Sequence, residues 1–273
     1  SAARPASHLD APPRTMKRSQ TASADAEPET KFARTTTIAQ SVAFITCDAE
    51  AQDILSVRDR RGLMKAVDNV LEAGANIINI AFPMTADTDT WRKGDLVDTD
   101  TILPEILSFL DGTWDHRSAG PLLSFFSTSA GTLRSELTLA ITSDYLEEPL
   151  AAIILTLDAP TGVLCTVNVS VPPLQSRTRG QLLGDLADAA EDTQAGNILI
   201  GGAWADSVLF TENQVAKLSS QFQLFTNAHL CLLTYNRDSS PMKCFPLDTG
   251  GPYSLMGIWE STKSLAPRRL AKL

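Results

Sequence analysis

The side chains that could do chemistry in this 273-residue chain are acids near the ends of predicted strands and a few histidines. Carboxylates in such places could hold Mg²⁺, and a histidine could move protons near neutral pH. A phosphoester hydrolase built from them would need the metal, a general base and a group that stabilises the leaving oxygen. The acids are Asp48, Asp144, Asp158, Asp206 and Asp248, and the histidines are His8, His116 and His229.

The positions of these residues do not favour that chemistry. Any strand-rich acidic protein offers as many aspartates at its turns, so we interpret the five as solvated turn residues and expect no bound metal or other cofactor. His8 lies in a polar tail, His116 in a polar loop and His229 just before an apolar strand. The Gly201-Gly202 pair lacks the rest of a phosphate-binding glycine loop, and we interpret it as a sharp turn ending a strand.

The elements that would position these groups are clearest between residues 163 and 205. A β-branched run over 163–171 is closed by two prolines, which predicts a strand. Leucines and alanines at helical spacing over 179–192, with aspartates on the other face, predict an amphipathic helix. A short buried-type strand over 197–200 follows. The stretch therefore predicts a strand, helix and strand in succession.

Other elements follow from the same patterns. A first strand over 37–48, an amphipathic helix over 58–73 and a buried strand over 76–82 repeat the order of that unit. The intervening chain predicts a short helix at 102–110, then a meander of strands. Those strands are 122–126, 137–143 and 151–157, and the later elements are a helix at 211–222, a strand at 230–235 and a final strand within 245–258.

The 163–205 stretch resembles the core of the endonuclease/exonuclease/phosphatase superfamily. In that family a strand ending N-x-H precedes a helix of the type R-xx-Q-L-xx-L, and a strand ending G-G-D-F-N follows. This chain has N-V-S-V-P at 168–172, R-G-Q-L-L at 179–183 and G-G-A-W-A at 201–205. The resemblance implies an α/β fold of the DNase I-like kind: a four-layer sandwich of two facing mixed β-sheets with helices outside.

The resemblance also implies that the family's catalytic groups are replaced. Ser170 stands at the family's His position, Ala203 at its Asp and Ala205 at its second Asn, while Asp48 stands near its first Asn and Phe82 at its metal-binding Glu. We therefore expect a pseudoenzyme, not an enzyme, that serves as a structural or interaction subunit of a larger protein assembly. The alternative is a divalent-metal-dependent phosphoesterase or nuclease with a relocated active site.

The same replacements predict what the family's cleft would contain. With an apolar lining, the cleft would suit a multiply charged phosphate poorly. We expect it to be filled by the protein's own side chains or by another protein segment. The residues expected to line it are Phe82, Ala203, Trp204 and Ala205.

The ends of the chain differ from its body. Residues 1–37 are rich in Ala, Ser, Thr and Pro with few large apolar side chains, which predicts a disordered-type tail that becomes ordered only on a partner. Residues 38–262 would form one DNase I-like domain, followed by a basic tail at 263–273. We expect both tails to bind other protein subunits, and the body to fold without residues 1–36.

Composition excludes some classes of partner. A net charge of −9 argues against sequence-independent binding of nucleic acid, which depends on Lys and Arg. The absence of an apolar stretch of about 18 residues predicts no membrane span.

Four cysteines without C-x-x-C spacing predict buried free thiols in a reducing, intracellular compartment, and the Arg- and Ser-bearing start leaves a mitochondrion or plastid open. The cysteines are Cys47, Cys165, Cys231 and Cys244.

Overall fold

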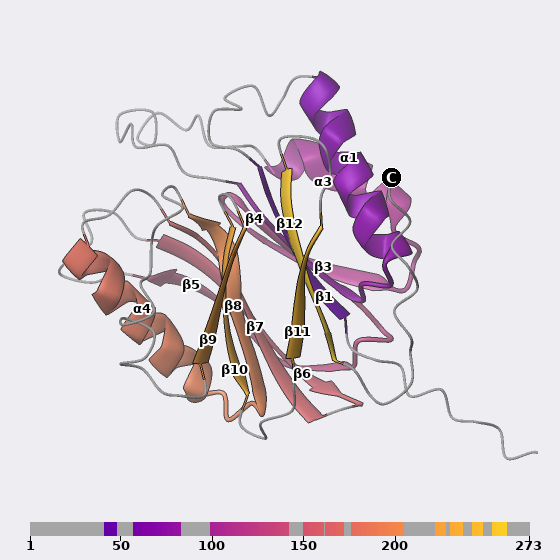
Figure 1. Cartoon of the computed structure of the whole chain (residues 1–273). Coiled ribbons are helices and arrows are strands. Elements are labelled where there is room, and N and C mark those ends of the chain that lie inside the picture. The colour runs from indigo at the N-terminus through magenta and orange to yellow at the C-terminus, as the bar shows by residue number, and fades with distance from the viewer. Residues whose placement is uncertain are drawn as a thin grey trace, which may run out of the picture. The chain divides into compact units, whose positions relative to one another are not determined.

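Figure 1 shows the fold as a computed structural model. It describes residues 41–47, 57–82, 99–141, 150–160, 162–171, 176–204, 222–227, 230–236, 242–247 and 253–260. The chain divides into two compact units, Ser1–Thr36 and Thr37–Leu273, and every described residue belongs to the second. The two predicted tails and residues 211–221 of the predicted helix at 211–222 lie outside the described residues, and Phe222 begins a strand.

Twelve described strands form two sheets of six. In strand order, the first sheet holds β11 (Met242–Leu247), β12 (Tyr253–Glu260), β1 (Ser41–Cys47), β2 (Ile77–Ala81), β4 (Leu122–Ser127) and β3 (Trp114–Ala119). The second holds β5 (Thr132–Ile141), β6 (Leu150–Ala159), β7 (Gly162–Val171), β8 (Asn197–Trp204), β10 (Leu230–Asn236) and β9 (Phe222–Asn227).

The two sheets follow the same plan. Each contains one parallel pair, β1 with β2 and β7 with β8, and all its other neighbours are antiparallel. A parallel pair needs a crossover connection, and a helix lies in each one: α1 (Val57–Glu72) between β1 and β2, and α4 (Ser176–Glu191) between β7 and β8. The two strand–helix–strand units predicted from the sequence are therefore present.

The layers are helix, sheet, sheet and helix, as Figure 1 shows. Helices α1 and α3 (Thr99–Phe109) pack on the outer face of the first sheet through a cluster that includes Leu63, Val67 and Ile106. A second apolar cluster fills the space between the sheets, and α4 covers the outer face of the second sheet. The four-layer α/β sandwich is confirmed. None of the described helices is long and apolar enough to span a membrane.

The strands from β4 to β6 correct the predicted meander. The chain leaves the first sheet after β4 and enters the second at β5, so these strands are not successive neighbours in one sheet. The turn passes close to β6: Gly131 has φ 137°, and a Cβ there would meet the backbone oxygen of Asp158 at 2.5 Å. Only glycine fits this crossing, and hydrophobic periodicity carries no information about which sheet a strand joins.

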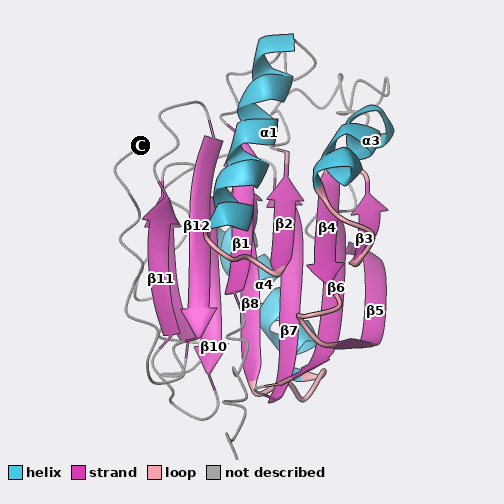
Figure 2. Ribbon diagram, turned by 90° about the vertical axis from the view of Figure 1, so that its right-hand side faces the viewer, coloured by secondary structure: helices cyan, strands magenta, loops and turns pink. Residues whose placement is uncertain are grey.

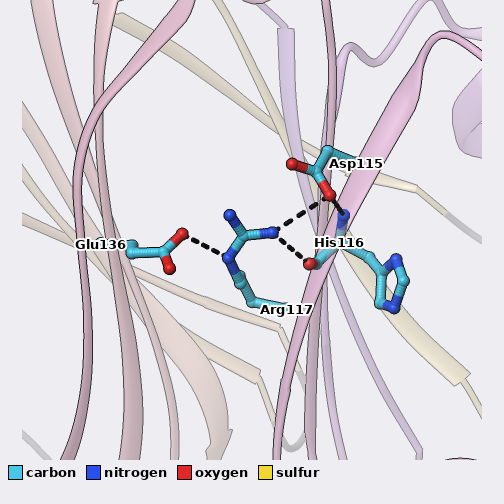
Figure 3. A network of polar contacts seen from close by, with 4 residues as sticks. All are labelled: Asp115, His116, Arg117 and Glu136. Atoms are coloured by element: carbon cyan, nitrogen blue, oxygen red, sulfur yellow. Dashed lines mark hydrogen bonds and ion pairs between the residues drawn. The ribbon is translucent and has the colours of Figure 1, made fainter.

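An arginine on β3 links the edges of the two sheets (Figure 3). The Arg117 guanidinium donates through Nε to Glu136 on β5 and through Nη1 to Asp115 at 3.1 Å and the carbonyl oxygen of His116 at 2.6 Å. It also lies over the ring of Phe126, 5.6 Å from the centroid. One planar side chain thus joins β3 of the first sheet to β5 of the second, a geometry that suits arginine.

Replacing Arg117 with methionine is expected to lower the free energy of unfolding by about 1 kcal/mol, since its ion pairs are partly exposed and screened. Urea unfolding at low and high salt measures this, and the loss should shrink at high salt. The matched control is Arg134→Met, because the Arg134–Asp158 pair is longer, 3.7 Å, and about half exposed. Equal losses of unfolding free energy in the two variants would show that the Arg117 link between the sheets adds no more stability than an ordinary exposed ion pair.

Candidate functional site

Three of the positions that the resemblance relates to the family's active site lie at the ends of β2, β7 and β8. Parallel pairing sets Ser170 of β7 directly beside Ala203 of β8. The Ser170 hydroxyl donates a hydrogen bond of 2.6 Å to the carbonyl oxygen of Phe82, the residue that follows β2. The structure thus brings together three of the five positions named from the resemblance. The other two, Asp48 and Ala205, lie outside the described residues.

Ser170 acts here as a structural donor between the sheets. Its side chain is fully buried, and its one hydroxyl hydrogen is used in the bond to Phe82. Ala203 is also fully buried and belongs to the apolar cluster between the sheets, next to Leu230 in the ladder of β8 and β10. Ala203 has no polar side-chain atom, and the donor of Ser170 is already used within the fold.

The side chain of Phe82 does not converge with Ala203 on the cleft region, so the expectation that it lines that cleft was wrong. Phe82 packs with Ile80 in the cluster under α1 and α3, whereas Ile77 and Ala81 belong to the cluster between the sheets. Strand alternation explains this, since residues at even and odd positions of β2 face opposite sides. Only the backbone of Phe82 reaches the site, where its carbonyl accepts from Ser170.

The glycine pair also differs from the prediction, because it lies inside β8 and does not end it. Gly201 pairs with Asn168 and Gly202 with Val169, and pairing continues to Trp204. A Cβ on Gly201 would lie 2.8 Å from the ring of Phe44 in the other sheet. Gly202 has φ 151°, and a Cβ there would lie 1.7 Å from the carbonyl oxygen of Val169. Close approach of backbone and ring therefore accounts for both glycines without a bound phosphate.

A buried polar cluster beside the site was not predicted from the sequence. Asn168 donates from Nδ2 to the carbonyl oxygens of Ile80 and Leu123, both at 3.0 Å, and approaches the Ser124 hydroxyl at 3.3 Å. Ser124 donates in turn to Asn79 Oδ1 at 2.8 Å. These contacts join β7 of the second sheet to β2 and β4 of the first. The available signal was a polar residue within each of three largely apolar strands: Asn79 in β2, Ser124 in β4 and Asn168 in β7.

The candidate acids and histidines do not meet at this site in the described part of the chain. Asp158 is exposed and pairs with Arg134 at 3.7 Å. His116, predicted to lie in a polar loop, is on strand β3, and its ring lies 6.1 Å from that of Phe125. Among the described residues, no three His, Cys, Asp or Glu side chains are grouped as a metal site would need. His8, His229 and the other four aspartates lie outside these residues.

Cys165 is a buried free thiol, as predicted, on the α4 side of β7. Burial raises its pKa to about 11, against a smaller lowering by hydrogen bonds with Thr193 and Thr156. The thiolate, which is the nucleophilic form, is therefore scarce at neutral pH. Cys165 has the properties of an inert core residue.

Solved structures with the same fold share little sequence with this chain. An endonuclease/exonuclease/phosphatase from Bacteroides vulgatus superposes with a TM-score of 0.57 at 9% identity, over 82% of this chain and 100% of that one. TDP2 of D. rerio, complexed with single-strand DNA product, gives a TM-score of 0.54 at 10% identity, over 81% and 99%. The human Nocturnin catalytic domain with bound sulfate gives 0.52 at 11% identity, over 80% and 93%.

No protein-family model matches the sequence, and neither does any curated protein. The similarity therefore rests on the arrangement of strands and helices, and at such low identity it shows the fold alone. The chain has the fold of the endonuclease/exonuclease/phosphatase superfamily.

Proposed function

We propose that this chain is a non-catalytic pseudoenzyme with the endonuclease/exonuclease/phosphatase fold and acts as a structural or interaction subunit of a larger protein assembly. The observation that carries the proposal is the burial of Ala203, fully covered within the apolar cluster between the sheets. The resembled family has a metal-site Asp at this position. A carboxylate placed there would lose its hydration in apolar surroundings.

The hydrogen bond of Ser170 supports the same conclusion. At the family's His position, a buried hydroxyl is committed to a main-chain carbonyl and joins the two sheets. Such a group contributes to the stability of the sandwich, and it cannot supply general acid–base catalysis near neutral pH as an imidazole does. The two glycines of β8 likewise have contacts within the fold that explain their presence.

The proposed assembly role rests on the folded body and the two ends of the chain. A folded sandwich with long ends poor in large apolar residues can present one rigid surface and two segments that become ordered on a partner. We propose that residues 1–37 and 263–273 bind other protein subunits. Deleting residues 1–36 should then weaken association with those subunits while the body stays folded.

Substitution of Ala203 by aspartate tests whether the family's metal position is closed. We expect the free energy of unfolding to fall by about 3 kcal/mol, because the new carboxylate is buried without a partner. The melting temperature should drop, and Mg²⁺ should not restore it. Ala189→Asp is the matched control, since Ala189 lies half-buried on α4 and the same change there should cost much less.

Two outcomes of this measurement would count against the proposal. An unchanged melting temperature without metal would mean that position 203 is open to water. A drop that Mg²⁺ reverses would mean that oxygen ligands remain nearby and that the metal site lacks only one group. The alternative function, a metal-dependent phosphoesterase with a relocated site, would then gain direct support.

A further inference from the structure

A groove of about 530 Å³ lies between helices α1 and α3, on the outer face of the first sheet. Figure 2 shows the two helices side by side over this sheet. The ends of β2, β7 and β8 belong to the two inner layers, which are the sheets. Met64 of α1 and Phe109 of α3 supply apolar surface to the groove. At one side the helices are joined by an ion pair of 3.0 Å from Arg60 Nη1 to Glu105 Oε1.

Phe109 is on the wrong face of α3 for a core residue. The buried face of this helix carries Ile102 and Ile106, while Phe109 lies four residues after Glu105 and is 49% exposed. Among the residues whose side-chain exposure the structure describes, the only other large apolar side chain so exposed is Leu137 on β5. Interface anchors are often aromatic side chains that the partner buries, and Phe109 at the edge of this groove is placed to act as one.

The charges on the rim limit what that partner can be. Arg61, Lys65 and Asp68 recur on the exposed face of α1 at helical spacing and line the groove. Arg60 is already paired with Glu105, whereas Arg61 and Lys65 form no ion pair within the described part of the chain. Two unpaired cations beside an apolar floor complement a segment that carries acidic and large apolar side chains together.

We infer that this groove binds a short acidic segment of a partner protein, with one aromatic or large aliphatic side chain inserted beside Phe109. The inference rests on the proposed role as an interaction subunit and names one contact surface for it. A small phosphorylated ligand fits less well, because the floor is apolar and two carboxylates, of Asp68 and Glu105, lie in the lining. A second copy of the chain that bound through this same face would fit less well, because the face carries no excess of acidic side chains.

The test is a selection from a display library of random short peptides on the full chain, followed by titration of labelled winners. We expect winners to combine acids with an aromatic or large aliphatic residue. Binding should weaken about tenfold or more in Phe109→Ser and in the Arg61→Glu, Lys65→Glu double variant. Leu137→Ser, at 50% exposure in the wild type, and the charge-keeping Lys65→Arg are the controls and should bind within about twofold.

Several results would overturn the inference. They are a selection without winners, winners rich in Lys and Arg, or winners whose affinity the groove variants leave unchanged. Sedimentation showing a wild-type dimer that Phe109→Ser dissociates would assign the groove to a second copy instead. The outcome is independent of catalysis: metal-dependent turnover would refute the pseudoenzyme proposal and leave this groove standing, while failed peptide binding would refute only the groove.

Discussion

Replacing Gly202 with alanine is expected to unfold the protein or lower its free energy of unfolding by about 4 kcal/mol or more. The added Cβ would lie 1.7 Å from the carbonyl oxygen of Val169, an impossible contact, and the residue has a φ of 151° that other amino acids rarely adopt. Relief would require β8 to separate from β7, which lies at the centre of the second sheet. Urea unfolding followed by circular dichroism measures the effect.

Gly184→Ala provides the matched control, because this glycine lies within α4 and an added Cβ meets nothing within 4 Å. Alanine should stabilise the helix by about 0.5–1 kcal/mol, since it loses less backbone freedom on folding. The same glycine-to-alanine change should therefore lower the free energy of unfolding at position 202 and raise it at position 184. A Gly202→Ala protein as stable as the wild type would show that the close approach of β8 to β7 is absent.

The second large effect is expected from Asn168→Asp, which keeps the shape of the side chain and removes its N–H donors. The carbonyl oxygens of Ile80 and Leu123 would lose their partner, and an ionised carboxylate would face them. Each buried group left without a partner costs about 1–3 kcal/mol, so the total loss should reach about 3 kcal/mol at neutral pH. Asn197→Asp, at the partly exposed start of β8, is the control and should cost little.

The loss from Asn168→Asp should depend on pH with a defined sign. Burial and the facing carbonyls raise the pKa of the new carboxyl in the folded protein above its unfolded value of about 3.9. Below the unfolded pKa both states are protonated, and the variant is then most stable relative to wild type. As pH rises from there to the folded pKa, the free energy of unfolding falls by up to about 1.4 kcal/mol per pH unit. A loss that is constant across this range would contradict the burial of position 168.

The sequence predicted the parts of the fold that local pattern controls. Helices expected at 58–73 and 179–192 are α1 at Val57–Glu72 and α4 at Ser176–Glu191, because both have amphipathic spacing. Strand β3 was missed because Trp114–Ala119 is mostly polar and partly exposed, without the apolar alternation that marks a strand. The change of sheet after β4 depends on packing between distant segments, which local periodicity does not report.

The candidate site was predictable in part, where local sequence motifs define its positions. Resemblance to the family named Ser170 and Ala203, and parallel pairing does place them side by side. Which face of β2 carries Phe82 depends on strand register, so the sequence alone could not assign it to the helix side. The contact of Asn168 with Ile80 and Leu123 joins residues far apart in the chain, and no spacing rule connects them.

Metal-dependent turnover tests the central proposal most directly. The purified full chain is incubated with Mg²⁺ or Mn²⁺ and a panel of single-stranded DNA, RNA and small phosphodiester and phosphomonoester substrates, beside an active nuclease of the same fold. We expect no product above the protein-free control with any substrate or metal. Turnover that requires the metal and is abolished by Asp48→Asn or Asp206→Asn would contradict the proposal and establish a relocated active site.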